Sequence, residues 1–236
     1  MKKRIIGAIY VLAWFGGGLF LCSGKFFTPI VFGWLVLAFA ELYVGKRFFF
    51  AGGHVGNPAY EECLPFAQAI LALAMCCCIL CEDYRIIALA VIACFVSDTC
   101  GLLVGKLLGE HNKVSALKNI SPNKSVAGFI GAIIVSAPIN YFVAVLLGLH
   151  ESVPVPSLVA FAAMSGAFAA GGDLLGSATK RYLGVKDSGK DLAKFPIIKY
   201  LEKPLLGGHG GYYDRMDSVC IEIVVAWIML GLKASP

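Results

Sequence analysis

The segment IIALAVIACFVSDTCGLLV, residues Ile86–Val104, is apolar and long enough to cross a bilayer as an α-helix, and Asp98 is its one charged residue. The rest of the chain has the same character. Of its 236 residues, 58% are hydrophobic and 15% are charged, and the mean hydropathy is +0.79. The apolar residues form long blocks that a core of this size could not bury. The sequence therefore predicts an integral membrane protein and excludes an ordinary soluble domain.

The apolar blocks predict an all-α, polytopic membrane helix bundle of about seven spans with cytoplasmic polar loops. The first two blocks and the last are short for a full crossing, so a short block could also belong to a re-entrant or tilted hairpin. The predicted spans are Ile5–Leu21, Pro29–Val44, Leu64–Leu80, Ile86–Val104, Val126–Leu149, Ser157–Leu175 and Ser218–Leu232.

The N-terminal MKKR and the apolar run that follows it could instead form a cleaved signal peptide. Leu21 stands where signal cleavage needs a small residue, and further spans follow. We therefore favour a retained first helix.

Basic residues predict the orientation of the chain. If the N-terminus is cytoplasmic, the segments on that side hold all 20 Lys and Arg residues except Lys25, Arg85 and Lys233. This bias follows the positive-inside rule. We therefore predict a multi-pass membrane protein whose two large polar loops face the cytoplasm.

Polar and ionisable residues divide the chain functionally. Residues 1–96 contain few of them within the spans beyond Glu41, and we predict an N-terminal membrane-helix scaffold there. The unusual polar segments follow Ser97, and we predict that residues 97–236 form the catalytic membrane region.

Carboxylates in this second region recur at one predicted membrane level. Asp98 and Asp173 lie near the cytoplasmic ends of their spans, and Asp214 and Asp217 begin the last span with a spacing that places both on one helix face. Such carboxylates are costly in a membrane and usually need a cation. We predict divalent-metal binding by Asp173, Asp214 and Asp217. The alternative is that these carboxylates cap helices or pair with Lys180, Arg181 or Arg215. For Asp98, a functional and a structural role both remain open. Glu222 could pair with a buried polar group.

Two further segments suit phosphate binding. The turn GGHGGYYDRMD, Gly207–Asp217, has glycines that let backbone N–H groups approach an anion. His209 within it could be a general base, a hydrogen-bond donor to phosphate or an ordinary loop histidine. The run KNISPNKSVAG, Lys118–Gly128, offers a hydroxyl and two lysines before a predicted helix, and it also fits a positively charged loop that sets topology.

Together these segments resemble the signature of the phosphatidate cytidylyltransferases, the CDP-diacylglycerol synthases. That signature runs Ser-x-x-Lys-Arg, four residues, Lys-Asp-x-Gly, a Pro-Gly-His-Gly-Gly-like turn and Asp-Arg-x-Asp. SDT at Ser97–Thr99 and SPNKS at Ser121–Ser125 are similar to two upstream motifs of the family. The matching signature residues are Ser177, Lys180, Arg181, Lys186, Asp187, Gly189, His209, Gly210, Gly211, Asp214, Arg215 and Asp217.

Three features depart from that family pattern. More than a dozen residues are inserted between Gly189 and Gly208, where the family has a short link. Val126 and Ala127 stand where the family usually has Trp and Glu, and Gly176 stands where it usually has Glu. These departures affect substrate fit and the surroundings of the carboxylates, which are themselves retained.

The resemblance implies a reaction in which the phosphate of phosphatidate attacks the α-phosphorus of CTP, giving CDP-diacylglycerol and pyrophosphate. It implies Mg2+, with a second cation possible, on Asp173, Asp214 and Asp217. It also implies two further groups of residues. The catalytic group is Lys180, Arg181, Asp187, His209 and Arg215, and the substrate-binding group is Asp98, Ser121, Lys124, Ser177, Lys186, Gly210 and Gly211.

The expected partners are CTP, phosphatidate and membrane lipids, with no nucleic acid and with a homodimer left open. One alternative is a CTP-dependent transferase or kinase that acts on an isoprenoid lipid. Another is a small transporter of a phosphorylated solute, because transporters also use Asp and glycine-broken helices within the membrane. Clustering of the charges at one face argues against a transporter.

The inserted segment alternates apolar and basic residues. Apolar residues recur every three or four positions from Leu192 to Leu205, with Lys190, Lys194, Lys199 and Lys203 between them. This pattern predicts a basic amphipathic helix on the anionic cytoplasmic leaflet, with a polar loop as the alternative.

Overall fold

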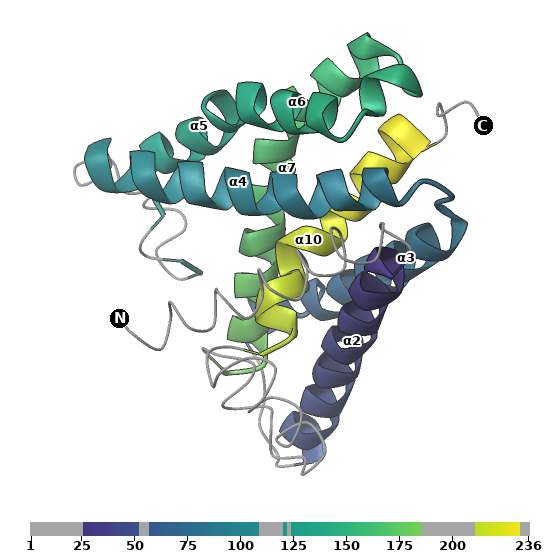
Figure 1. Ribbon diagram of the computed structural model, residues 1–236. Helices are drawn as coiled ribbons and strands as arrows, with labels where there is room; N and C mark the ends of the chain where they lie inside the picture. Colours follow the sequence, from purple (N-terminus) through teal and green to yellow (C-terminus); the bar gives the residue numbers. More distant parts are fainter. Residues whose placement is uncertain (1–25, 52–56, 109–119, 122–123, 186–210, 232–236) are drawn as a thin grey trace, which may run out of the picture. The chain divides into compact units, whose positions relative to one another are not determined.

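The computed structural model of the protein describes residues 26–51, 57–108, 120–121, 124–185 and 211–231 (Figure 1). The regular elements there are helices, which confirms the predicted all-α class. The long helices are α2 Phe27–Ala51, α3 Cys63–Leu80, α4 Tyr84–Leu108, α5 Val126–Ile134, α6 Ser136–Leu146, α7 Val155–Tyr182 and α10 Tyr213–Ala226. Two short 3-10 helices, η1 Pro58–Tyr60 and η3 Leu149–Glu151, lie between them, and the π-helical η4 Trp227–Gly231 follows α10.

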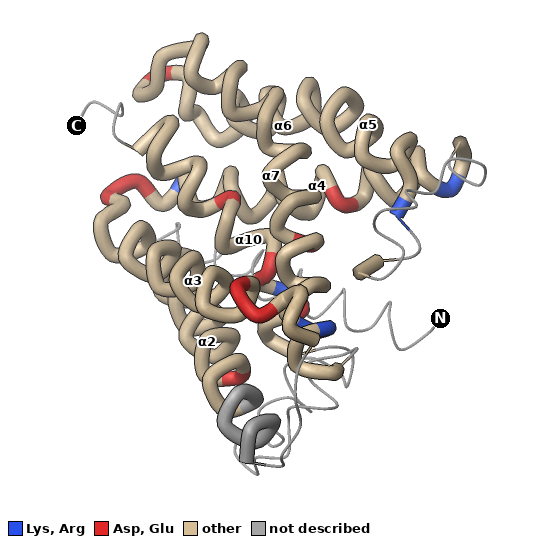
Figure 2. The backbone as a smooth tube through the Cα atoms, turned by 180° about the vertical axis from the view of Figure 1, so that it is seen from behind, with Lys and Arg blue, Asp and Glu red and all other residues tan. Residues whose placement is uncertain are grey.

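Five of the described helical segments are long and apolar enough to cross a membrane: Phe27–Val44, Pro58–Leu80, Tyr84–Leu108, Val126–Leu146 and Val155–Tyr182. They confirm a polytopic membrane protein, and they match five of the seven predicted spans. The first predicted span, Ile5–Leu21, lies outside the described residues. The last predicted span, Ser218–Leu232, corresponds to α10 and η4. This helical segment is not among the five, and it carries four charged residues: Asp214, Arg215, Asp217 and Glu222. Figure 2 shows how few charged residues interrupt the apolar helices.

The predicted span Val126–Leu149 is divided in the structure. Helix α5 ends at Ile134, and α6 begins at Ser136. Pro138 explains the break, because proline has no N–H to donate to the carbonyl four residues earlier and its ring clashes with that carbonyl. Ser136 adds to it by donating its hydroxyl to the carbonyl of Ala132.

By packing, the chain forms two compact units. Unit 1 contains Met1–Cys78 and Leu175–Asp217, and unit 2 contains Ile79–Leu174 and Ser218–Pro236. Helices α7 and α10 therefore contribute to both. These units are defined by contacts between helices. The predicted division after residue 96 was instead based on where the polar and ionisable residues lie, and it stays a prediction.

Helices α2 and α3 of unit 1 each bury a regular apolar stripe. Val31, Leu35, Ala38 and Leu42 of α2 are fully buried and recur every three or four residues. In α3, the buried residues also recur every three or four positions: Leu64, Ala67, Leu71 and Ala74. Phe66 and Leu73 point outward and are 59% and 49% exposed, as expected for side chains that face lipid.

Unit 2 is built around α4, in which every residue from Ile86 to Val91 is buried. In Figures 1 and 2, α4 runs beside α5 and α6. Glycines permit this approach: a Cβ on Gly128 of α5 would lie 2.9 Å from the carbonyl oxygen of Gly101 on α4. Small residues commonly let membrane helices pack this closely.

Buried polar side chains link the helices of unit 2. Asn140 of α6 donates to Ser165 Oγ of α7 at 2.7 Å, and Ser97 Oγ of α4 donates to Ser136 Oγ of α6 at 3.2 Å. All four side chains are fully buried. Because hydrocarbon offers no hydrogen bonds, these contacts favour one arrangement of the three helices.

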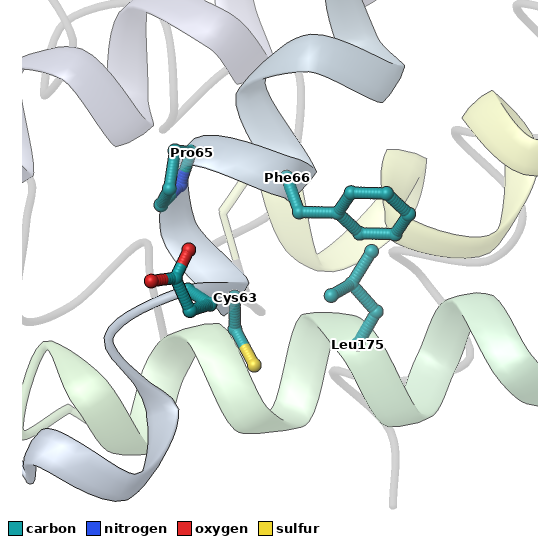
Figure 3. A pocket seen from close by; sticks show the side chains of 5 residues that line it. Cys63, Pro65, Phe66 and Leu175 are labelled. Carbon is teal, nitrogen blue, oxygen red and sulfur yellow. The ribbon is translucent and has the colours of Figure 1, made fainter.

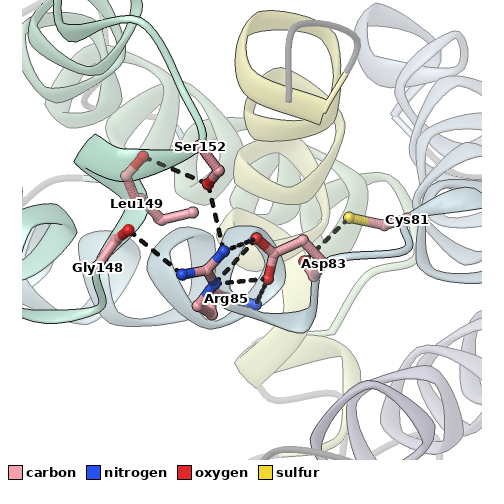
Figure 4. A network of polar contacts seen from close by, with 6 residues as sticks. All are labelled: Cys81, Asp83, Arg85, Gly148, Leu149 and Ser152. Carbon is pink, nitrogen blue, oxygen red and sulfur yellow. Dashed lines mark hydrogen bonds and ion pairs between the residues drawn. The ribbon is translucent and has the colours of Figure 1, made fainter. Parts of the chain in front are cut away.

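A second polar network joins the beginning of α4 to the connection between α6 and α7 (Figure 4). Arg85 pairs with Asp83 at 2.8 Å and donates to the carbonyl of Gly148 at 3.3 Å and to Ser152 Oγ at 3.2 Å. Gly148 has φ +73°, a left-handed conformation that favours glycine. Arg85 is one of the three basic residues predicted on the non-cytoplasmic side, and the network gives it a structural role.

Candidate active site

The beginning of α10 carries Asp214 in its first turn and Asp217 just after it, and we call this pair the acidic turn. Lys180, near the end of α7, points its ammonium between them, with Nζ 2.5 Å from Asp214 Oδ1 and 3.8 Å from Asp217 Oδ2. The side chains of Lys180, Asp214 and Asp217 are only 13%, 15% and 8% exposed. Charges sheltered from water in this way interact strongly with one another and with charged ligands. The three groups belong to unit 1.

Backbone contacts explain why α10 begins where it does. Gly211 donates its N–H to Asp214 Oδ2 at 3.0 Å, so the Asp214 carboxylate binds both Lys180 and the chain that enters the helix. Arg215 and Met216 each donate an N–H to the carbonyl of Tyr212 at 3.1 Å. Carboxylates at this end of a helix are also favoured by its dipole.

Glu41 of α2 is a contributor that the sequence did not reveal. It is 1% exposed, and its Oε2 accepts the N–H of Tyr213 at 2.8 Å. The sequence placed Glu41 in a scaffold helix. Its one signal was an isolated carboxylate in an apolar span, a type of residue that usually has a buried partner.

Gly176 lets the acidic turn lie directly against α7. A Cβ at position 176 would overlap with the side chain of Asp217. Gly176 was noted from the sequence as a departure from the family pattern. The structure gives the departure a physical meaning, because the Asp217 side chain occupies the space beside this glycine.

Unit 2 contains a separate charged group. Lys124 Nζ lies 2.8 Å from Asp173 Oδ2 and donates to the carbonyl of Ala170 at 3.1 Å. Asp98 of α4 interacts electrostatically with both Asp173 and Lys124. Ser125 caps α5, because its Oγ accepts the N–H of Gly128 at 3.1 Å. The structure thus brings together Asp98, Lys124 and Asp173, which were predicted from three different segments of the sequence.

The other predicted site residues are distributed as follows. Ser177, Arg181, Gly211 and Arg215 are described in unit 1, and Ser121 is described in unit 2, where its carbonyl accepts the N–H of Lys124 at 3.3 Å. The remaining predicted residues lie outside the described part of the chain: Lys186, Asp187, His209 and Gly210.

The metal prediction can be compared with the donors present. Among the described residues, no three His, Cys, Asp or Glu side chains gather as a ready metal site. The acidic turn nevertheless has suitable chemistry, because two carboxylates on one helix face hold a cationic group between them and Mg2+ prefers oxygen donors. The pairing of Asp214 with Lys180 is also the alternative that the sequence raised.

A cavity of about 370 Å³ in unit 1 does not belong to this chemistry (Figure 3). Glu62, Cys63, Pro65, Phe66 and Leu175 line it, and the Phe66 ring lies over the Leu175 side chain. It contains none of the signature residues.

Residues 59–233 match the sequence profile of the cytidylyltransferase family. The chain belongs to the cytidylyltransferase family. The matched region includes every residue of the predicted site and the inserted segment. Family membership thus confirms the resemblance drawn from the motifs.

Known members of the family with similar sequences are called phosphatidate cytidylyltransferase. The protein of Staphylococcus epidermidis is 32% identical over 149 residues, which cover 63% of this chain and 50% of that relative. The Mycobacterium leprae protein is 38% identical over 141 residues, 60% of this chain and 39% of the relative. The chain thus aligns with half or less of these cytidylyltransferases. No solved structure matches it significantly.

Proposed function

We propose that the chain is a membrane cytidylyltransferase that transfers CMP from CTP to phosphatidate. A phosphate oxygen of phosphatidate attacks the α-phosphorus of CTP, a bond forms between them, and the bond to the β-phosphate oxygen breaks to release pyrophosphate. Family membership and the names of the relatives support this activity. The structural observation that carries it is the sheltered Lys180 beside Asp214 and Asp217.

The residues of the chain perform positioning and charge neutralisation in this reaction. Two anions must meet, and negative charge develops on the leaving pyrophosphate, so fixed cationic groups lower the barrier. Lys180, Arg181 and Arg215 contact phosphates, and each arginine can do so with two parallel hydrogen bonds. A phosphate nucleophile is already ionised near neutral pH, so His209 serves in phosphate binding more than as a base.

Mg2+ is the proposed cofactor. When bound by Asp214 and Asp217, it would supply positive charge next to the phosphates of CTP. Asp173 stays a predicted magnesium ligand, because the sequence places it at the same membrane level as Asp214 and Asp217 and the family resemblance implies a metal there. Asp98, Ser121 and Lys124 stay predicted substrate-binding residues.

We also propose that the active site faces the cytoplasm, because the basic residues follow the positive-inside rule and CTP enters from water. The acyl chains of phosphatidate then remain in the lipid. A homodimer and the absence of a nucleic-acid partner remain predictions.

The test is an assay of purified protein in detergent with labelled CTP, Mg2+ and a panel of lipid phosphates and polyprenols. We expect pyrophosphate to appear in step with a CDP-lipid, and phosphatidate to be the preferred acceptor. CDP together with a phosphorylated lipid would indicate the kinase alternative, in which attack falls on the γ-phosphorus. A transporter would form no product in detergent.

A further inference from the structure

Glu41 is a buried carboxylate in an otherwise apolar helix. It is the one charged residue between Phe26 and Val44, and its neighbours Ala38 and Leu42 are fully buried. A carboxylate in such surroundings is costly unless it binds a polar group. One such polar group is the backbone N–H of Tyr213, which lies 2.8 Å from Oε2.

Tyr213 is the first residue of α10, and its N–H has no acceptor within the helix. The backbone N–H groups of Gly211, Arg215 and Met216 donate to acceptors within the segment from Gly211 to Met216. The bond to Glu41 is different because it comes from another helix. It places a negative charge at the positive end of α10, which strengthens the contact.

Helix α2 holds the preceding residue as well. The rings of Trp34 and Tyr212 meet edge to face, with centroids 5.5 Å apart and planes at 74°. Trp34 and Glu41 are seven residues apart and so lie on the same face of α2. One face of α2 therefore contacts two successive residues, Tyr212 and Tyr213, at the point where α10 begins.

The start of α10 decides where the acidic turn points. Successive residues of an α-helix are rotated by about 100°, so a shift of the helix start by one residue would turn Asp214 and Asp217 away from Lys180. A contact that fixes the first N–H of α10 therefore fixes the direction of both carboxylates.

We propose that Glu41 is a positioning residue: by accepting the N–H of Tyr213, it fixes the start of α10 and holds Asp214 and Asp217 against Lys180. The role of this contact in turnover rests on the proposed function. Glu41 acts through the backbone of Tyr213 and not on the substrate. Helix α2 thus takes part in the active site instead of serving only as scaffold.

Three substitutions test the contact. Glu41→Gln keeps an oxygen acceptor of the same length, Glu41→Met removes it at similar volume, and Glu41→Asp keeps the charge but loses reach. We expect Glu41→Gln to stay within about threefold of wild-type kcat and Glu41→Met to lose about tenfold or more. The Mg2+ concentration for half-maximal rate should rise in Glu41→Met and Glu41→Asp, whereas KM for CTP should change less. Glu61→Gln, an exposed carboxylate of the same unit, is the matched control.

A second measurement does not depend on activity. In a background with Trp14→Phe and Trp227→Phe, Trp34 is the one tryptophan left. We expect acrylamide to quench its fluorescence more in Glu41→Met than in Glu41→Gln, because loss of the cap loosens Tyr212 from Trp34. Gly33→Ala, at a position with open space on the same helix, should leave quenching unchanged. If Glu41→Met does not fold, Glu41→Asp provides both readouts.

Wild-type kcat, Mg2+ dependence and Trp34 quenching in Glu41→Met and Glu41→Asp would overturn the proposal. Loss of activity to the same degree in Glu41→Gln and Glu41→Met, with no difference in quenching, would also overturn it, because the negative charge and not the acceptor would then matter. A wild-type protein that forms no CDP-lipid would instead refute the proposed function, and the quenching comparison would still decide whether Glu41 fixes the start of α10.

Discussion

Lys180 meets both carboxylates of the acidic turn, and the two carboxylates are also groups that bind divalent cations. One ammonium faces two carboxylates, all three of them mostly sheltered from solvent. Carboxylate oxygens are donors that Mg2+ prefers, and Mg2+ bound to them would supply positive charge next to the phosphates of CTP.

The acidic turn gives the first prediction. Asp214→Asn and Asp217→Asn should each lower Mg2+-dependent pyrophosphate release by about 100-fold or more, the usual effect of removing one fixed charge from an active site. Membrane insertion should not change. Glu61→Gln should release pyrophosphate at the wild-type rate. Near-normal turnover in either Asp variant would remove the turn from the proposed metal site.

Asp173 gives the second prediction. Its side chain is 43% exposed, so its ion pair with Lys124 contributes at most about 1 kcal/mol to stability. Asp173→Asn should therefore leave the unfolding temperature in detergent nearly unchanged. It should still lower turnover by about 100-fold and raise the Mg2+ requirement of the remaining activity. Lys124→Met breaks the same pair and should not alter the Mg2+ requirement. Equal Mg2+ titrations in the two variants would mean that Asp173 serves only the ion pair.

Sequence reasoning found the residues of the acidic turn because their spacing of three along a helix is local information. It also listed Lys180 among their candidate partners. It could not find the role of Glu41, because the contact with Tyr213 joins positions 172 residues apart. The contact of Asp217 with the space beside Gly176 could not be predicted either, because it depends on how α10 packs against α7 within unit 1.

At the scale of helices, composition predicted most of the spans and Pro138 explains the main difference. The apolar run Val126–Leu149 has no polar interruption strong enough to divide it by hydropathy. The covalent geometry of proline nevertheless separates α5 from α6. The last predicted span also differs from the others, because it corresponds to the 14-residue α10 followed by the π-helical η4 and not to one long α-helix.

Close helix packing gives the third prediction. A Cβ on Gly166 of α7 would overlap with the backbone of Ala132 and Ile133 on α5, whereas a Cβ on Gly171 of the same helix would meet nothing within 4 Å. Gly166→Ala should therefore destabilise the protein by about 1–3 kcal/mol. Gly171→Ala should be neutral or gain up to about 1 kcal/mol from helix propensity.

Thermal unfolding in detergent compares the two variants directly. A lower Tm for Gly166→Ala and an unchanged or higher Tm for Gly171→Ala are expected. Equal unfolding temperatures would show that α5 and α7 do not pack as closely as the structure has them.

At the scale of the whole molecule, hydropathy and charge could predict a membrane protein and its orientation but not its grouping into two units. Hydropathy depends only on composition along the chain, whereas the units arise from contacts between distant segments, such as α2 with the beginning of α10. The inserted segment from Lys190 to Leu206 lies outside the described residues, so its predicted amphipathic helix rests on sequence alone.

That segment gives the fourth prediction, because its lysines would attract the chain's cytoplasmic side to anionic lipid. Each lysine near an anionic bilayer contributes about 1 kcal/mol. Lys194→Gln, Lys199→Gln and Lys203→Gln together should therefore raise the apparent KM for phosphatidate about tenfold or more in low-salt vesicles rich in phosphatidylglycerol. KM for CTP should not change, since CTP arrives from water. Arginine at the same three positions should preserve the wild-type KM, and the effect should vanish in vesicles of phosphatidylcholine as the only bulk lipid. Equal shifts for both substrates would instead place these lysines at the nucleotide site.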